Sequence, residues 1–388
     1  MKLSLRIVAV CGLSLAAVNR ACSQTWTPAN PPVVGCARIV SSADGSKLFG
    51  VSSSSSTYYL STNAGASWDQ PPGPFSNVTA IACSADGNRL VVAASELIYV
   101  STNEGDSWEQ HTNQQPVTSL ACTSDGMTVF AACNSPVFMS TDGGASWTPF
   151  TNAPPAYFIT CSADATTIAV GGGEPVFVST NSGATWFAST EFGPGVPNPV
   201  CSADGLHLVA RDANFRILTS ANSGVTWVTN PLPQTSYSSL AISADGTTVA
   251  AAHAFNGYLY VSSNGGLNWQ SDFVSTNGSF ANPSFACVTA SADGARLTAV
   301  DGMNPDGSNM YFWQSTPRPR LGMEISGSEI KLSWIVPSTP FVLQHNSDLA
   351  TTNWVTLTNN PTLNLSTLRN EVTLPLNGEN TFYRLATP

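Results

Sequence analysis

Short apolar runs alternate with polar turns along most of this 388-residue chain, and two kinds of turn recur. The first reads SADG and lies between apolar runs such as Val78–Cys83 and Leu90–Ala94. An Asp-Gly pair between apolar runs is a strong signal for a β-hairpin, because glycine readily adopts the positive φ that a tight turn needs. SADG or a close variant begins at Ser42, Ser84, Thr123, Ser162, Ser202, Ser243 and Ser291, which predicts seven hairpins.

The second turn follows another short apolar strand and ends at a tryptophan, as in YVSTNEGDSW at Tyr99–Trp108. Its tryptophans are Trp68, Trp108, Trp147, Trp186, Trp227 and Trp269, at spacings of 40, 39, 39, 41 and 42 residues. A period of about 40 residues with four short strands in each repeat is typical of the blades of a β-propeller. The repeats show no sustained helical periodicity, which excludes a helical repeat architecture.

The number of turns predicts how the ring closes. Seven SADG-type turns accompany six tryptophan turns, because the seventh repeat leaves the pattern at Thr316–Arg320. The missing outer strand matches Gln24–Pro28, whose Trp26 precedes Trp68 by 42 residues and so stands in register with the repeat. We therefore predict an all-β fold in which residues 24–316 form a seven-bladed propeller. The N-terminal strand completes the last blade and protects its edge from pairing with another chain.

The pattern changes after a Pro-rich hinge at residues 317–320. From there, residues 321–388 contain runs of alternating apolar and polar positions, such as EIKLSWIV and TFYRLA. This alternation predicts a small C-terminal β-sandwich that is similar to fibronectin-III-like modules. We expect Trp334, Trp354 and Phe382 to lie in its core.

The first 22 residues are organised like a secretory signal peptide, with a basic start, an apolar run at Ile7–Val18 and small residues around Cys22. That run is too short to span a membrane, and no later stretch is long enough. A lipoprotein anchor at Cys22 is the alternative, but Asn19 and Arg20 stand where such an anchor favours small or apolar residues. The sequence thus predicts a protein that is secreted or located in the periplasm or at the cell surface.

Composition narrows the class of partner. Charged residues make up 10% of the chain, and the formal net charge is −10. A neutral to acidic surface argues against nucleic acid or an anionic membrane as a partner. The four histidines show no metal-binding spacing, and no phosphate-binding glycine loop is present, so no cofactor is predicted.

Four of the nine cysteines occupy one repeated position, three residues before the aspartate of an SADG-type turn. They are Cys83, Cys122, Cys161 and Cys201. Two later repeats place Ile242 and Ala290 there, which indicates a small buried apolar position rather than a disulfide framework. Disulfides between neighbouring blades remain an alternative for an exported protein.

The tryptophan turns follow the pattern S-x-[DN]-x-G-x-[ST]-W, which resembles the Asp-box, or BNR, repeat of the sialidase-like propeller superfamily. Its role in that family is structural: the Asp or Asn caps the turn, glycine permits positive φ, and the aromatic ring packs between strands. The matching residues are Ser61, Asn63, Gly65, Trp68, Ser101, Asn103, Gly105, Trp108, Ser140, Asp142, Gly144, Trp147, Ser179, Asn181, Gly183, Trp186, Ser220, Asn222, Gly224, Trp227, Ser262, Asn264, Gly266 and Trp269. Asn268 departs from the pattern at the Ser/Thr position.

The resemblance implies a site on the face opposite these turns, where sialidases hold three arginines, a Tyr–Glu pair and an acid/base aspartate. On that face this chain offers Arg38, Arg211 and Arg216, the last two within one loop. The arginine motif that opens typical sialidases is absent. We therefore do not expect sialidase activity.

A different glycoside hydrolase needs two carboxyl groups across a cleft, and Glu174 and Asp212 lie in loops of adjacent blades. The loop DGMNPDGSN offers oxygen atoms from Asp301, Asn304 and Asp306 for a metal ion, but an ordinary Asx/Gly loop explains it as well. Glu174 and Asp212 define the enzymatic alternative.

Our leading hypothesis is a non-catalytic binding or interaction scaffold for an extracellular protein or glycan. In this respect the chain is similar to non-enzymatic Asp-box propellers such as photosystem assembly factors and sortilin-type receptors. The loops opposite the tryptophan turns supply the candidate binding residues Arg211, Arg216, His253, Phe255 and Asp301. Aromatic residues on the same face are candidates for stacking on sugars or peptides: Phe75, Tyr157, Phe192, Phe215, Phe255, Tyr258 and Tyr311.

Overall fold

The computed structural model is all-β. It describes residues 8–9, 26–29, 36–52, 57–112, 115–173, 175–189, 191–192, 197–274, 283–302, 310–315, 319–337, 339–376 and 381–388. Within these ranges the chain forms strands and turns and no helix, which confirms the prediction of an all-β protein. None of the described residues belongs to a helix long and apolar enough to cross a membrane.

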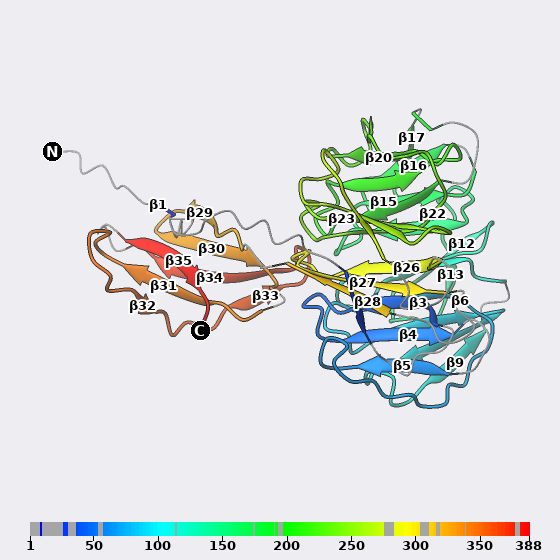
Figure 1. Cartoon of the computed structure of the whole chain (residues 1–388), viewed down its shortest axis with the longest axis horizontal. Coiled ribbons are helices and arrows are strands. Elements are labelled where there is room, and N and C mark those ends of the chain that lie inside the picture. Colours follow the sequence, from blue (N-terminus) through cyan, green and yellow to red (C-terminus); the bar gives the residue numbers. More distant parts are fainter. Residues whose placement is uncertain are drawn as a thin grey trace.

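Seven antiparallel sheets follow one another through residues 27–314 (Figure 1), each with its strands in sequence order except the last. The first holds β3 (Cys36–Ser41), β4 (Leu48–Ser52) and β5 (Tyr58–Ser61), and isolated bridges such as Leu60–Asp69 take the place of a fourth strand. The second holds β6 (Val78–Cys83), β7 (Leu90–Ala94), β8 (Leu97–Ser101) and β9 (Glu109–Thr112). The third holds β10 (Ser119–Cys122), β11 (Val129–Ala132), β12 (Val137–Ser140) and β13 (Thr148–Pro149).

The remaining four sheets repeat this meander. The fourth holds β14 (Phe158–Cys161), β15 (Ile168–Gly171), β16 (Val176–Ser179) and β17 (Phe187–Ser189). The fifth holds β18 (Asn198–Cys201), β19 (Leu208–Arg211), β20 (Ile217–Ser220) and β21 (Val228–Thr229). The sixth holds β22 (Tyr237–Ile242), β23 (Val249–His253), β24 (Tyr258–Ser262) and β25 (Gln270–Phe273), and the seventh holds β26 (Phe285–Ala290), β27 (Arg296–Asp301) and β28 (Met310–Gln314).

The outer strand of the seventh sheet comes from the other end of the chain. Strand β2 (Thr27–Ala29) pairs antiparallel with β28, and Thr27 lies opposite Phe312. This confirms the predicted pairing of the N-terminal segment with the last repeat. Trp26, just before β2, is buried in a cluster with Val274 of the sixth repeat and Trp313 of the seventh.

The seven SADG-type turns are joined into a closed circuit by backbone hydrogen bonds. The second residue of each turn donates its N–H to the carbonyl of the equivalent residue in the next, at 2.6–3.1 Å. The circuit runs through Ala43, Ala85, Ser124, Ala163, Ala203, Ala244 and Ala292, and the last of these donates back to Ala43. Every sheet is therefore held to both of its neighbours at this end of the molecule.

Each SADG-type turn is also stabilised by hydrogen bonds from its own polar side chains. In the first, the hydroxyl of Ser42 donates to Asp44 at 2.6 Å and accepts the N–H of Lys47 at 3.0 Å. The same carboxylate accepts the N–H of Ser46 at 3.0 Å. These bonds hold the pKa of Asp44 below its usual value, although burial acts to raise it. The sequence SADG thus supplies a donor, an acceptor and a flexible glycine in the order that the turn needs.

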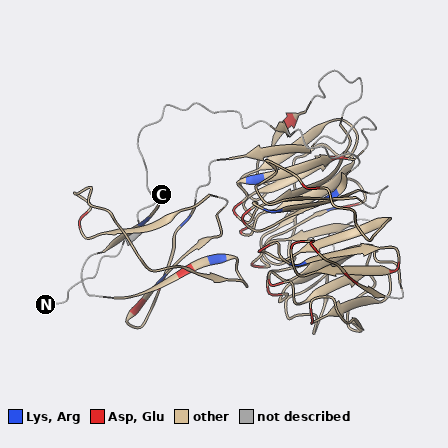
Figure 2. Ribbon diagram, turned by 90° about the horizontal axis from the view of Figure 1, so that it is seen from below, with Lys and Arg blue, Asp and Glu red and all other residues tan. Residues whose placement is uncertain are grey.

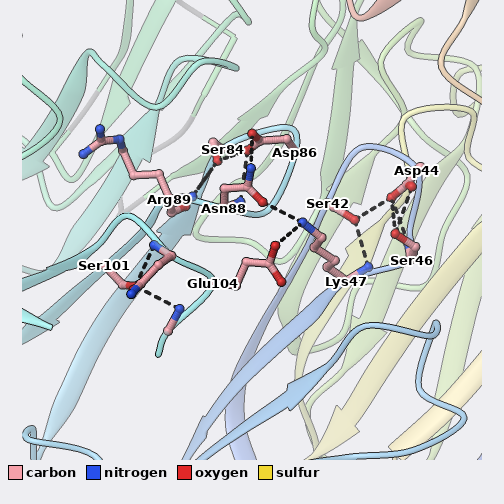
Figure 3. Close-up of polar contacts among 12 residues, drawn as sticks. Ser42, Asp44, Ser46, Lys47, Ser84, Asp86, Asn88, Arg89, Ser101 and Glu104 are labelled. Carbon is pink, nitrogen blue, oxygen red and sulfur yellow. Dashed lines mark hydrogen bonds and ion pairs between the residues drawn. The ribbon is translucent and has the colours of Figure 1, made fainter. Parts of the chain in front are cut away.

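Side chains from the first and second repeats, Lys47 and Arg89, reach toward the turns of the following repeat (Figure 3). The ammonium group of Lys47 lies 2.6 Å from Asn88 Oδ1 and 2.9 Å from Glu104 Oε1, both in the second repeat. Arg89 in turn donates to the carbonyl of Gly143 in the third repeat at 3.3 Å. The turn glycines are required partly because these side chains approach so closely that a Cβ would touch them.

Residues 322–386 form two further sheets beside the seven. One has the order β29 (Gly322–Ser326), β30 (Glu329–Ile335), β34 (Arg369–Pro375), β33 (Thr362–Asn364). The other contains β31 (Val342–Asn346), β32 (Val355–Thr356), β35 (Phe382–Ala386) and β1 (Val8–Ala9), which falls within the predicted leader and runs parallel to β35. One buried cluster joins the two sheets through Leu332, Trp334, Leu343 and Tyr383.

The expected core of this module is correct for Trp334 alone. Trp334 is 2% exposed, whereas Trp354 and Phe382 are half-buried and do not belong to the buried cluster. The guanidinium of Arg384 lies 4.2 Å from the centre of a Trp354 ring. This cation–π contact explains a half-buried tryptophan that alternation had assigned to the core.

Replacing the tryptophan before the closing strand tests the ring closure. Trp26→Ala should lower the free energy of unfolding by about 3–5 kcal/mol, because it removes a buried aromatic side chain where the two ends of the ring meet. Urea denaturation followed by tryptophan fluorescence and circular dichroism measures the loss. Val228→Ala on the outer strand β21 is the matched control: its side chain is 62% exposed, and the loss should stay below about 0.5 kcal/mol. Equal losses in the two variants would contradict the closure.

Two glycines allow the stability cost of a close side-chain contact to be measured separately from the cost of a positive φ. Gly294 has φ of +63°, and a Cβ there would overlap Thr248, whereas Gly327 has φ of +60° and open space around it. Gly327→Ala should cost about 1–2 kcal/mol for the left-handed backbone alone. Gly294→Ala should cost about 1–3 kcal/mol more, since the β-branched Thr248 has little freedom to move. Similar losses in thermal denaturation would show that the contact with Thr248 is unimportant.

Candidate functional site

The two ends of the seven-sheet assembly differ in chemistry. The turn end carries the SADG-type turns and the tryptophan turns, and the loop end carries the connections between the second and third strands and between successive sheets. Acidic residues gather at the turn end, which faces the C-terminal module (Figure 2). The candidate binding residues from the sequence all lie at the loop end.

The tryptophan turns use their polar residues internally. In the second repeat, Ser101 Oγ accepts the N–H of Gly105 at 2.8 Å and donates to Asn103 Oδ1 at 2.9 Å. Asn103 also accepts the N–H of Ser107 at 3.0 Å. In the third repeat Asp142 takes the place of asparagine, and hydrogen bonds from Ser146 hold its pKa well below the usual value. These residues build turns and are not available to a ligand.

At the loop end, Asp212 and Arg216 bind each other. They begin and end the connection between β19 and β20, where Asp212 Oδ2 accepts from Arg216 Nε at 2.6 Å and Oδ1 accepts the Arg216 N–H at 2.8 Å. The Asp212 side chain is completely buried. Both carboxylate oxygens are thus engaged within their own loop, which leaves this group poorly placed to act as a general acid or nucleophile.

The loop that Asp212 organises displays an aromatic ring. Phe215 has φ of +59° and is 40% exposed. The guanidinium of Arg211 lies 5.7 Å from the centre of the Phe215 ring, within the range of a cation–π contact. Burial lowers the pKa of Arg211, but the side chain remains a cation at neutral pH. Arg211 and Phe215 together form a cationic and aromatic surface at the rim.

In the sixth repeat His253 holds a loop in place, as Asp212 does in the fifth. It is 3% exposed, its Nδ1 accepts the N–H of Phe255 at 3.0 Å, and its Nε2 contacts the hydroxyl of Thr235. Because Nδ1 accepts, the proton of the neutral ring sits on Nε2 and donates to Thr235. Burial lowers the pKa of His253, so the ring is neutral at pH 7. It fixes a loop from which Phe255 projects, 65% exposed.

Asp301 ends β27 and is buried, with its carboxylate accepting the N–H of Ser284 at 3.1 Å. Asn304 and Asp306 of the proposed metal loop lie outside the described residues, as does Glu174. Among the residues that are described, no group of three or more His, Cys, Asp or Glu side chains is placed to hold a metal ion. The carboxylate pair Glu174 and Asp212 therefore stays a prediction.

The aromatic residues expected at the loop end divide into two groups. Phe75, Phe192 and Tyr311 are buried and belong to the packing between strands. Tyr157, Phe215 and Phe255 are 38%, 40% and 65% exposed and come from loops of the fourth, fifth and sixth repeats. Tyr157 is held by its N–H to Gly171 O at 2.8 Å. Exposed rings on fixed loops can contact a partner at a small cost in conformational entropy.

Sequence reasoning missed two contributors to this end. Thr235 completes the hydrogen bonding of His253, and Phe273, at the end of β25, is 50% exposed. Thr235 gives no signal because it is one hydroxyl in a chain rich in them. Phe273 gives no signal because its sequence position is that of an ordinary outer-strand residue.

Comparison with known proteins supports the fold. No family model and no curated protein matches the chain. Solved structures do: the Cps50 (Swd1) β-propeller domain of Myceliophteria thermophila matches at 13% identity and a TM-score of 0.59, covering 75% of this chain and 100% of the domain. YCF48 bound to D1 peptide matches at 17% identity and a TM-score of 0.55, covering 75% and 97%. A GH74 enzyme of Niastella koreensis matches at 15% identity and 0.58, covering 80% and 59%. The chain is therefore a β-propeller protein, and at these identities the likeness shows the fold alone.

The two histidines with shifted pKa values predict opposite responses to pH. For His253 the folded pKa lies below the usual 6.5, so the unfolded chain takes up the proton first and the free energy of unfolding should fall as pH drops below about 6.5. His253→Gln should remove this part of the pH dependence.

His207 is the matched comparison. The Asp204 carboxylate, 3.9 Å away, raises its pKa above 6.5, so its contribution is complete below that pH and is lost as pH rises through the raised pKa. His207→Gln should therefore destabilise the protein more at pH 5.5 than at pH 8. Urea denaturation between pH 5 and 8 checks both variants, and identical pH profiles would contradict the assignments.

Proposed function

We propose that this protein is a secreted, non-catalytic binding scaffold that presents the loop end of a seven-bladed Asp-box propeller to an extracellular protein or glycan. The closed circuit of seven turns and the pairing of β2 with β28 support the blade count. The turn bonding of Ser101 and Asn103 supports the Asp-box assignment. The buried cluster shared by the two C-terminal sheets supports a small β-sandwich, and the leader pattern supports export.

One observation carries the proposal: at the loop end Asp212, Arg216 and His253 are engaged in contacts within the protein, while three aromatic rings are exposed. Asp212 is bound to Arg216, and both nitrogens of His253 have partners. Phe215 and Phe255 are exposed on loops that these contacts hold in place, and Tyr157 is exposed where its N–H binds the carbonyl of Gly171. Catalysis needs a free acid or base, whereas binding needs fixed contact area, so the arrangement suits recognition.

A protein or peptide partner has a precedent in the same fold, since the YCF48 propeller is solved with D1 peptide. A glycan partner fits the neutral surface of this chain, in which charged residues are 10% of the sequence. The rival proposal of a glycoside hydrolase depends on Glu174 and Asp212. The engagement of Asp212 with Arg216 weakens it.

Binding and turnover can be measured on the same preparation. The mature protein should bind at least one component of a glycan array or an extracellular protein library, and it should not hydrolyse a panel of chromogenic glycosides. Phe215→Ala with Phe255→Ala should weaken that binding by about tenfold or more, since exposed anchors of this kind supply most of the affinity. Hydrolysis that is abolished by Glu174→Gln would overturn the scaffold proposal in favour of the enzyme.

The matched control for the double variant is Leu267→Ala. Leu267 is 71% exposed and lies in the tryptophan turn of the sixth repeat, at the turn end. Its replacement should leave binding unchanged. An equal loss in Leu267→Ala would place the binding surface elsewhere.

A further inference from the structure

The C-terminal module touches the propeller at the ring of SADG-type turns. Ile335, Val336 and Leu368 of the module form one apolar cluster with the turn alanines Ala43, Ala163, Ala203, Ala244 and Ala292. The end of the module that holds the β33–β34 connection points toward the propeller (Figure 1). The seventh sheet also ends there, because β28 leaves at the turn end, a few residues before β29 begins. The module is therefore tethered beside the surface that it covers.

The ring of SADG-type turns surrounds a cavity, which we call the central channel, and Leu368 is the residue of the module that lines its mouth. It lies between β33 and β34 with φ of +51°, and its carbonyl accepts the N–H of Val336 at 2.9 Å. It lines a cavity of about 200 Å³ together with the alanines of the ring. A positive φ is unfavourable for leucine, so the surrounding bonds and contacts hold the residue in that position.

Four thiols line the same cavity: those of Cys83, Cys122, Cys161 and Cys201. None of these four cysteines forms a disulfide. Cys122 Sγ donates to the carbonyl of Cys83 at 3.0 Å, and Cys83 Sγ donates to that of Ser41 at 3.3 Å, so these two thiols bridge to the neighbouring inner strand. Burial raises the pKa of Cys122 to about 12, and the other three are raised as well.

Ser124 distinguishes one position in an otherwise uniform ring. Six of the seven ring residues are alanine, and the TSDG turn alone places a serine there. The Ser124 hydroxyl donates to the carbonyl of Leu365 in the module. Because the seven turns are similar, the module could seat Leu368 on the ring in seven similar orientations. The Ser124 hydroxyl makes one of these orientations different from the other six.

We propose that the C-terminal module is a lid, locked in one rotational orientation over the turn-end mouth of the channel, with Leu368 as the plug and Ser124 as the orienting contact. The lid shields the four channel thiols from reagents at that mouth. It also removes the turn end from use by other proteins, so that partners approach the loop end. This inference stands independently of the partner proposed above.

Thiol labelling of the full-length mature protein tests the plug. Leu368→Gly removes the side chain while keeping a residue that tolerates positive φ, so the turn should still fold. Labelling of Cys83, Cys122, Cys161 and Cys201 by a maleimide, followed by mass spectrometry, should accelerate by about tenfold or more, because the half-buried Leu368 side chain no longer holds the lid closed. Small-angle X-ray scattering should show a larger maximum dimension.

Leu363→Ala is the control, since Leu363 lies on β33 of the same module and is 45% exposed. It should leave both readouts at wild-type values. Wild-type labelling rates and dimensions in Leu368→Gly would overturn the plug. Rapid labelling of the four thiols in the wild-type protein would overturn the shielding.

A second pair of variants tests the orienting contact. Ser124→Ala should accelerate labelling between about twofold and tenfold, the range expected for one lost hydrogen bond. Ala85→Ser adds a hydroxyl at a ring position that the module does not bind, and it should change nothing. Equal rates for Ser124→Ala and wild type would show that Ser124 does not hold the lid, whatever the result for Leu368.

Discussion

The closed circuit of backbone hydrogen bonds through the seven SADG-type turns is the constraint on which the rest of this structure depends. Each turn donates to the next and accepts from the one before, so no turn can shift without breaking bonds on both sides. The side chains that reach under neighbouring glycines, such as Lys47 and Arg89, add a second link between the same sheets. The hydrogen bonds of each turn therefore contribute to the stability of the whole ring.

Because the ring is built from repeated local turns, much of the fold could be predicted from the sequence. SADG and the tryptophan turn are short, local patterns, and their period of about 40 residues placed the strands of all seven repeats close to where they lie. The pairing of β2 with β28 was also predictable, because the turn counts did not match and Trp26 stood in register with the repeat. Periodicity can locate a missing element even when its partner is almost 300 residues away.

The features that the sequence could not predict depend on contacts that occur only once and follow no repeated pattern. The sequence did not indicate that Leu368 contacts the ring alanines, because an alanine in SADG looks like an ordinary turn residue. Trp354 was assigned to a core by alternation, but its position against Arg384 is set by the packing of two distant strands. At the loop end, the sequence indicated candidate residues by type and position. Their roles were not indicated, since nothing in the order of residues tells that Asp212 and His253 support neighbouring aromatic rings.

The strand that completes the seventh sheet has a consequence for the order of events during synthesis. Thr27 Oγ1 donates to the carbonyl of Phe312, 285 residues later. The outer strand of the seventh sheet is thus synthesised well before its partner strand. Until β28 emerges, β2 has no sheet to join, and long-range pairing of this kind is slow and leaves edges exposed. The ring therefore stays open until its last repeat has been synthesised.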